Sequence, residues 1–307
     1  MWSVVVVMPA IESDFNIDRG KASLLYATTM VGFGLGNFLI GKIIDKYGLK
    51  LPIIVATIIL VLSYLIGTIS TEFWHLLILQ IFMGAAAATF FGPSMADIGN
   101  FFEKRRGLAV AIIASANYVA GAFWPLIISY FLETTTWKDV YLYIALICII
   151  IMIPISFFLK NNISQNEANT TVEASNSKLT NLSPSTLQTL LILAGVGCCL
   201  AMAMPQVHIV ALCVERGFGL SIGAEILAVM LFSGMISRVG FGFLSDKIGP
   251  VYTLFIGSLL QMISLVFFLP FDSQLSLYIV SLMFGLSQGG IVPAYAMIVR
   301  KYLPLKE

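Results

Sequence analysis

Long apolar runs, separated by short polar connections, dominate the pattern of the chain. Crossing the apolar core of a bilayer takes about 20 residues in a helix. Runs of that length lie at 22–44, 51–70, 74–102, 108–132, 140–159, 187–214, 221–244, 251–270 and 275–299. A shorter apolar run, Met1–Ile11, predicts the outer half of a first helix. The pattern therefore predicts an all-α membrane protein.

The composition supports this class and excludes others. Hydrophobic residues make up 59% of the 307 residues, charged residues only 11%, and the mean hydropathy is +0.95. Soluble domains carry about a quarter charged residues, so the chain is not of that kind. A net charge of +1 offers no basic surface for nucleic acid. The four cysteines lie in apolar runs without metal-ligand spacing, so we expect no metal and no cofactor.

Basic residues of the connections concentrate on one side of the predicted membrane. One side holds Lys42, Lys46, Lys50, Lys104, Arg105, Arg106, Lys160, Lys178, Lys247, Arg300, Lys301 and Lys306, and the other holds Arg19, Lys21, Lys138 and Arg216. Cytosolic connections are the ones enriched in Lys and Arg. The bias predicts a multi-pass protein of a plasma or bacterial inner membrane. Its cytosolic parts would be 41–50, 103–107, 161–186, 245–250 and the C-terminal end.

An internal repeat predicts the domain organisation. The stretch Gly41–Gly48 (GKIIDKYG) returns as Gly242–Gly249 (GFLSDKIG), 201 residues later, and FMG at 82–84 returns as MFG at 283–285. We therefore expect an N-terminal bundle at 1–160 with a partial first helix. The polar segment 161–186 would be the linker. A C-terminal bundle with four of six helices would follow at 187–307.

Arg238 is the first candidate for a solute ligand. It lies in the stretch Val229–Gly249, in the middle of a predicted membrane helix that leads into a tight cytosolic turn. A guanidinium stays charged, and holding it at membrane depth costs from about 2.5 to more than 10 kcal/mol, so it should face a watery or anion-filled cavity. The alternative is that Arg238 reaches the membrane surface, or pairs with a carbonyl for structure alone.

The motifs carry a resemblance to a known family. The turn GKIIDKYGLK at 41–50, the segment PSMADIGNFFEKRR at 93–106 and Ser237-Arg238 ahead of GFGFLSDKIG are similar to the major facilitator superfamily, and within it to the monocarboxylate and oxalate/formate branch. The resemblance implies a secondary transporter of small organic anions, such as monocarboxylates, that works by alternating access. It implies a monomer, with a proton or counter-anion as co-transported partner. It also implies that the chain is part of a protein of roughly 400 residues.

The two glycine turns are the candidate conformational latch. Gly48 and Gly249 give the backbone the freedom to end one helix and reverse. Asp45 and Asp246 can accept from backbone amides at a helix start. The resemblance implies that such turns hold the outward-open state, with Asp246 meeting the fifth helix near Arg105. The full set is Gly41, Asp45, Lys46, Gly48, Gly242, Asp246, Lys247, Gly249, Arg105 and Arg106.

Other polar groups at membrane depth are weaker candidates for the anion site. They are His208, Asn117, Tyr118, Trp124, Gln288 and Tyr295. A lone histidine or an aromatic residue at helical spacing is more often a packing residue. Small residues at Gly32–Gly36 and Gly84–Ala88 predict close contacts between helices of opposite halves.

Departures from the branch leave alternatives open. Gly234 stands where proton-coupled relatives have an aspartate, and Ala10 stands where they have a lysine. Both departures put proton coupling by that pair in doubt. A carrier of another solute class is one alternative. The motif Gly285-Leu-Ser287-Gln-Gly289 would also fit a serine hydrolase with His208 as base, although that motif needs a strand-to-helix turn.

Overall fold

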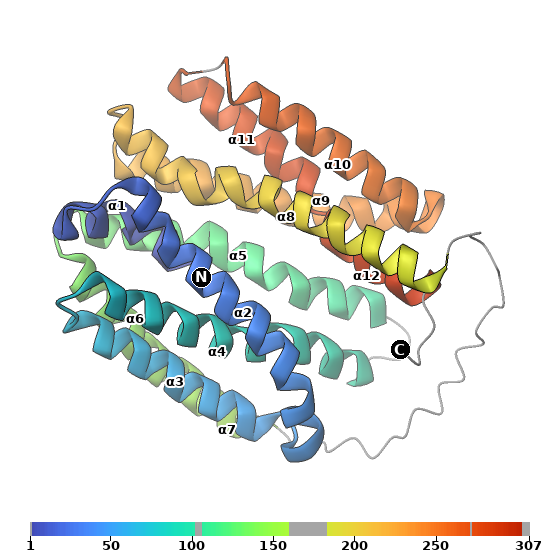
Figure 1. The fold of residues 1–307 in the computed structure, drawn as a ribbon, viewed down its shortest axis with the longest axis horizontal. Helices are drawn as coiled ribbons and strands as arrows, with labels where there is room; N and C mark the ends of the chain where they lie inside the picture. Colours follow the sequence, from blue (N-terminus) through green and yellow to red (C-terminus); the bar gives the residue numbers. More distant parts are fainter. Residues whose placement is uncertain (1, 102–105, 160–182, 271, 303–307) are drawn as a thin grey trace. The chain divides into compact units, whose positions relative to one another are not determined.

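A computed structural model describes residues 2–101, 106–159, 183–270 and 272–302. For residues 45, 91–101, 106–114, 184, 246, 296, 300 and 301 it describes the backbone alone. The helices are α1 (Trp2–Phe15), α2 (Arg19–Tyr47), α3 (Lys50–Thr68), α4 (Phe73–Phe101), α5 (Arg106–Leu132), α6 (Trp137–Ile147), η1 (Cys148–Met152), α7 (Ile153–Phe158), α8 (Pro184–Glu215), α9 (Leu220–Ile248), α10 (Pro250–Phe267), α11 (Gln274–Gln288) and α12 (Ile291–Tyr302) (Figure 1). The described ranges contain no strand, which confirms the all-α class.

Eight helical segments in the described ranges are long and apolar enough to cross a membrane. They coincide with eight of the runs predicted from the sequence, and the remaining run, 108–132, is the helix α5. The predicted run 140–159 contains the π-helical segment η1, just ahead of Pro154. Proline has no backbone N–H, so a local change of hydrogen-bond spacing is expected there.

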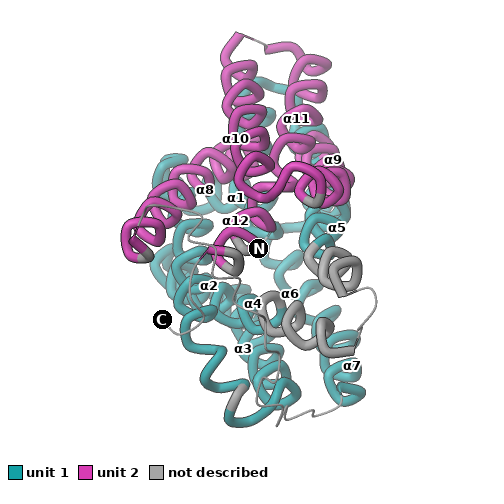
Figure 2. The backbone as a smooth tube through the Cα atoms, turned by 90° about the vertical axis from the view of Figure 1, so that its right-hand side faces the viewer, with its two compact units in different colours: residues 1–165, 210–224 teal, residues 166–209, 225–307 magenta. Residues whose placement is uncertain are grey.

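The chain forms two compact units (Figure 2). Unit 1 contains residues 1–165 and 210–224, and unit 2 contains residues 166–209 and 225–307. The end of α8 and the beginning of α9 therefore pack with the first unit, although they follow the predicted linker in sequence. Most of that linker lies outside the described residues. Its last residues already form the first turn of α8, where the Ser183 hydroxyl accepts from the Thr186 N–H at 3.2 Å.

The repeat extends to the boundaries of the helices. α2 and α9 are both 29 residues long, and an offset of 201 relates Arg19 to Leu220 and Tyr47 to Ile248. The same offset relates the ends of α4, at 73 and 101, to residues 274 and 302, which begin α11 and end α12. One copy of this span is a single helix, whereas the other is interrupted at Gly289 and Gly290.

Close packing against α9 accompanies this interruption, which the sequence did not predict. A Cβ at Gly289 would overlap the backbone of Gly234 and Arg238, and a Cβ at Gly290 would overlap the ring of Phe241. Only glycine allows two backbones to approach so closely. In the other copy the same places hold Ala88 and Thr89, and α4 continues through them. The run 275–299 is thus one candidate span that contains two helices, α11 and α12, where one helix was expected.

Small residues also pack α2 against α4 within unit 1. A Cβ at Gly32 would overlap the backbone of Ile81, and one at Gly84 would overlap the backbone of Thr29. Helices in a membrane associate closely where small residues meet. The expectation that these glycines join opposite halves is wrong. They join α2 to α4 within one half. Gly285 makes the equivalent contact between α11 and α9, next to Met230.

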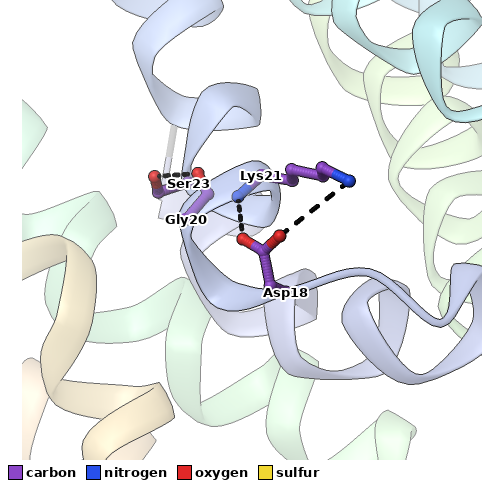
Figure 3. A network of polar contacts seen from close by, with 4 residues as sticks. All are labelled: Asp18, Gly20, Lys21 and Ser23. Carbon is purple, nitrogen blue, oxygen red and sulfur yellow. Dashed lines mark hydrogen bonds and ion pairs between the residues drawn. The ribbon is translucent and has the colours of Figure 1, made fainter.

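Asp18 caps the start of α2, shortly after the end of α1 (Figure 3). The Asp18 carboxylate accepts from the Lys21 N–H at 2.8 Å, and the Lys21 ammonium lies 3.9 Å from its second oxygen. The Ser23 hydroxyl donates to the Gly20 carbonyl at 2.7 Å. An aspartate at this position satisfies one of the free N–H groups of the first turn. The first residue of α2, Arg19, forms an ion pair with Glu215 at the end of α8.

Candidate functional site

Arg238 is held in unit 2 against the junction between α11 and α12. Its side chain is buried, with 7% of the residue exposed, and its Nε donates to the Gly289 carbonyl at 3.3 Å. The neighbouring Ser237 hydroxyl donates to the Leu286 carbonyl. The last carbonyls of a helix have no partner within it, so α9 supplies donors to the end of α11. The Arg238 guanidinium therefore lies at the α11–α12 junction, where the second copy of the repeat is interrupted and the first copy is a continuous helix.

Two glutamine side chains form a hydrogen-bonded pair at the same end of α11. Gln206 of α8 donates from Nε2 to the Oε1 of Gln288 at 2.6 Å, and both side chains are buried. Gln288 directly precedes Gly289, so Arg238 and Gln206 reach adjacent residues. Gln288 was a candidate from the sequence, whereas Gln206 was missed. The only signal for Gln206 was its position two residues before His208 in an apolar helix.

The other two candidates of unit 2 lie on α8 and α12. His208 is half-buried on α8. The Tyr295 hydroxyl of α12 donates to the Cys198 sulfur at 3.4 Å, and that sulfur lies 3.4 Å from the Ser258 hydroxyl of α10. Tyr295 thus joins α12 to α8, and Cys198 in turn contacts α10.

The three candidates on α5 belong to unit 1. Trp2 of α1 donates from Nε1 to both the backbone and the side-chain oxygen of Asn117, each at 3.1 Å. Tyr118 is buried and Trp124 is half-buried. Asn117 fixes α1 to α5 in this structure, because the indole N–H of tryptophan is a donor that needs a partner when it is buried.

Unit 1 also contains a buried polar chain that the sequence did not point to. The Thr29 hydroxyl of α2 donates to Gln80 of α4 at 2.8 Å, and Gln80 donates to the Tyr141 hydroxyl of α6 at 3.1 Å. Tyr141 packs edge to face on Tyr64 of α3, whose hydroxyl lies 2.9 Å from that of Ser3 on α1. A satisfied polar network of this kind fixes the packing of several helices at once.

The two glycine turns have the same backbone conformation. Gly48 has φ +73° and ψ 178°, and Gly249 has φ +85° and ψ 161°. Residues with a side chain almost never adopt this region. Lys46 and Lys247 are exposed beside the turns. The side chains of Asp45, Asp246 and Arg106, and the whole of Arg105, lie outside the described residues.

Alanine at either turn glycine is expected to destabilise the protein. Because the backbone there is nearly exclusive to glycine, Gly48→Ala and Gly249→Ala should each cost about 1–3 kcal/mol of folding free energy. The midpoint of thermal unfolding of the purified protein in detergent measures this loss.

Gly41→Ala and Gly242→Ala are the matched controls. Both glycines lie inside helices with open space around them, so alanine should change stability by at most about 1 kcal/mol, in the stabilising direction. Equal losses at all four positions would contradict the assignment of the turns.

The serine motif lies inside a helix. Ser287 is buried in α11, and its hydroxyl donates to the Phe284 carbonyl one turn earlier at 2.6 Å. A nucleophile of this motif class needs a strained turn between a strand and a helix, which α11 does not provide. The geometry of Ser287 therefore offers no support for hydrolysis.

Comparisons with known proteins agree on one family. A family model described as Major Facilitator Superfamily matches residues 1–307. MFS-type transporter 1 of Ophiocordyceps sp. is 22% identical over 303 residues, which cover 96% of this chain and 66% of that protein. A Fujikurins efflux protein of Gibberella fujikuroi is 32% identical over 102 residues, covering 33% of this chain and 22% of that protein.

A solved structure has the same fold. The crystal structure of the nucleoside transporter NupG (D323A mutant) matches with a TM-score of 0.72 at 12% identity, covering 99% of this chain and 80% of that one. At this identity the likeness concerns the fold alone. The chain spans just under two thirds of the length of the first relative.

Proposed function

The chain belongs to the Major Facilitator Superfamily, and on that premise we propose that it serves as a secondary transporter of small organic anions by alternating access. The observation that carries the choice of anion is Arg238. It is a permanently charged side chain on a helix apolar enough to cross a membrane, and it is buried.

The geometry around Arg238 supports an anionic ligand. One of its hydrogen bonds goes from Nε to the Gly289 backbone carbonyl, which holds the side chain at the α11–α12 junction. A guanidinium presents five donors in a flat fork and pairs well with a carboxylate through two parallel hydrogen bonds. Such a pair in a site of low dielectric provides both affinity and orientation.

Monocarboxylates are the proposed solutes, with a proton or a counter-anion as partner in transport. A carrier of another solute class is the second candidate. It is favoured by one relative, whose name describes an efflux protein for fujikurins. Glu225 on α9 is a carboxylate of unit 2, and its side chain is exposed. It accepts a hydrogen bond from the Tyr278 hydroxyl at 2.5 Å, which holds it against α11.

We propose the remaining roles from the sequence pattern. His208, Asn117, Tyr118, Trp124, Gln288 and Tyr295 would complete the solute site. The two glycine turns with Arg105 and Arg106 would form the conformational latch on the cytosolic side. The protein would function as a monomer in a plasma or bacterial inner membrane.

Transport into proteoliposomes tests the proposal. Radiolabelled acetate, butanoate and benzoate are offered to vesicles that contain the protein, and butanamide serves as the uncharged match of butanoate. Saturable uptake of at least one carboxylate above the rate of empty vesicles is expected, with no excess uptake of the amide. Uptake of neutral solutes alone would favour the second candidate and contradict the anion assignment.

A further inference from the structure

The amide pair formed by Gln206 and Gln288 contains an unsatisfied donor. Gln288 has 0% of its surface exposed and Gln206 has 5%. The Oε1 of Gln288 accepts from Gln206, but its Nε2 has no hydrogen-bond partner among the described residues. A buried donor without a partner costs about 1–3 kcal/mol, and such groups in native proteins call for an explanation.

The position of this donor links it to the solute site. Gln288 is adjacent to Gly289, whose carbonyl accepts from Arg238. Arg238 of α9 and Gln206 of α8 therefore contact two consecutive residues at the end of α11, the first through a backbone carbonyl and the second through the Gln288 side chain. Gln206 holds the amide plane of Gln288 by a bond of 2.6 Å, and this fixes the direction in which Nε2 donates.

We propose that Gln288 determines the specificity for the solute. Its Nε2 donates to an oxygen that the solute carries in addition to its carboxylate, and Gln206 is the positioning residue that orients the Gln288 amide. This inference rests on the proposed function, with Arg238 as the ligand of the carboxylate. The favoured solutes are carboxylates with a carbonyl oxygen a few bonds from the carboxyl group. An analogue without that oxygen leaves the buried donor unsatisfied and is taken up more slowly.

The α11–α12 junction explains how a solute reaches a fully buried amide. Gln288 directly precedes Gly289 and Gly290, which interrupt a span that is continuous in the first repeat. Gln288 is fully buried, so neighbouring groups must move before Nε2 meets a solute. Two consecutive glycines at this place provide the backbone freedom for that movement.

Matched solutes test the inference. Uptake into proteoliposomes is compared for butanoate against 2-oxobutanoate and for pentanoate against 4-oxopentanoate. We expect the wild type to prefer at least one oxo compound about tenfold or more, since a satisfied buried donor is worth a factor of that order. Gln288→Met keeps the volume of the side chain and removes the amide, so the preference should fall to near unity.

Two further variants complete the design. Gln206→Met should reduce the same preference, and it provides a second test if Gln288→Met does not reach the membrane. Ser281→Ala removes another buried polar atom without a partner on α11, and it should leave the preference unchanged. No preference in the wild type, or a preference retained in the glutamine variants, would overturn the inference. Uptake that is independent of Arg238 would instead overturn the proposed function itself.

Discussion

Replacing Arg238 with alanine is expected to lower the uptake of carboxylates by at least about 30-fold. Removing one partner of a buried charge pair costs about 2–5 kcal/mol, and 1.4 kcal/mol corresponds to a factor of ten. Arg238→Lys should lose most of the uptake as well. Lysine keeps the charge but lacks the flat fork that binds a carboxylate through two hydrogen bonds. Initial rates in proteoliposomes, divided by the amount of inserted protein, measure the effect.

A purely structural role for Arg238 predicts a different result. In that case the side chain would serve only to satisfy the Gly289 carbonyl, and uptake would fall only as far as the folded fraction falls. Thermal unfolding of each variant therefore accompanies the uptake measurement. Arg216→Ala is the matched control, because Arg216 is exposed beyond the end of α8 and should not affect uptake. Normal uptake by well-folded Arg238→Ala protein would remove Arg238 from the site.

Gly289→Ala is expected to impair both stability and transport. The added methyl group would overlap the backbone of Gly234 and Arg238, so α9 and the α11–α12 junction would have to separate. Overpacking of this kind costs about 1–3 kcal/mol. Because the displaced backbone carries Arg238, uptake should fall about tenfold or more in protein that remains folded. The conformation of Gly289 is ordinary, at φ −59°, so the effect comes from crowding rather than from backbone strain.

Gly240→Ala provides the control for this variant. Gly240 lies on α9 two residues after Arg238, with nothing within 4 Å of its Cβ position. Alanine there should leave uptake within about twofold and should not lower stability, since alanine is the better helix former. If Gly289→Ala behaved like Gly240→Ala, the junction would not be closely packed in the functional protein.

The fold was predictable because membrane helices are specified by length and apolarity. Eight of the runs read from the sequence return as candidate spans, and the repeat offset of 201 relates the helix ends. The turn glycines were predictable too, because a reversal within two residues demands a backbone that only glycine adopts. Gly48 and Gly249 have that backbone.

The interruption at Gly289 and Gly290 could not be read from the sequence. Both glycines lie in an apolar run, and apolarity does not reveal which helix approaches them. The same limit explains the error about Gly32 and Gly84. Their size indicates a close contact, but the contacting helix depends on tertiary packing. The structure places that contact between α2 and α4.

The candidate site was only partly predictable. Arg238 was identified because a charge at membrane depth is costly enough to demand a reason. Neutral amides and hydroxyls are cheaper and leave weaker signals, so Gln206 and the chain through Gln80 were missed. Asn117 was chosen for its depth alone, and its contact with Trp2 depends on the packing of α1 on α5.

Equilibrium binding of a carboxylate to the purified protein tests the central claim most directly. Labelled butanoate and 2-oxobutanoate are titrated against the wild type and against Arg238→Lys, with butanamide as competitor. The wild type should bind at least one of the two anions saturably, without displacement by the amide, and the variant should bind it at least tenfold more weakly. Equal affinity of the two proteins for the anion would contradict the assignment of Arg238 as its ligand.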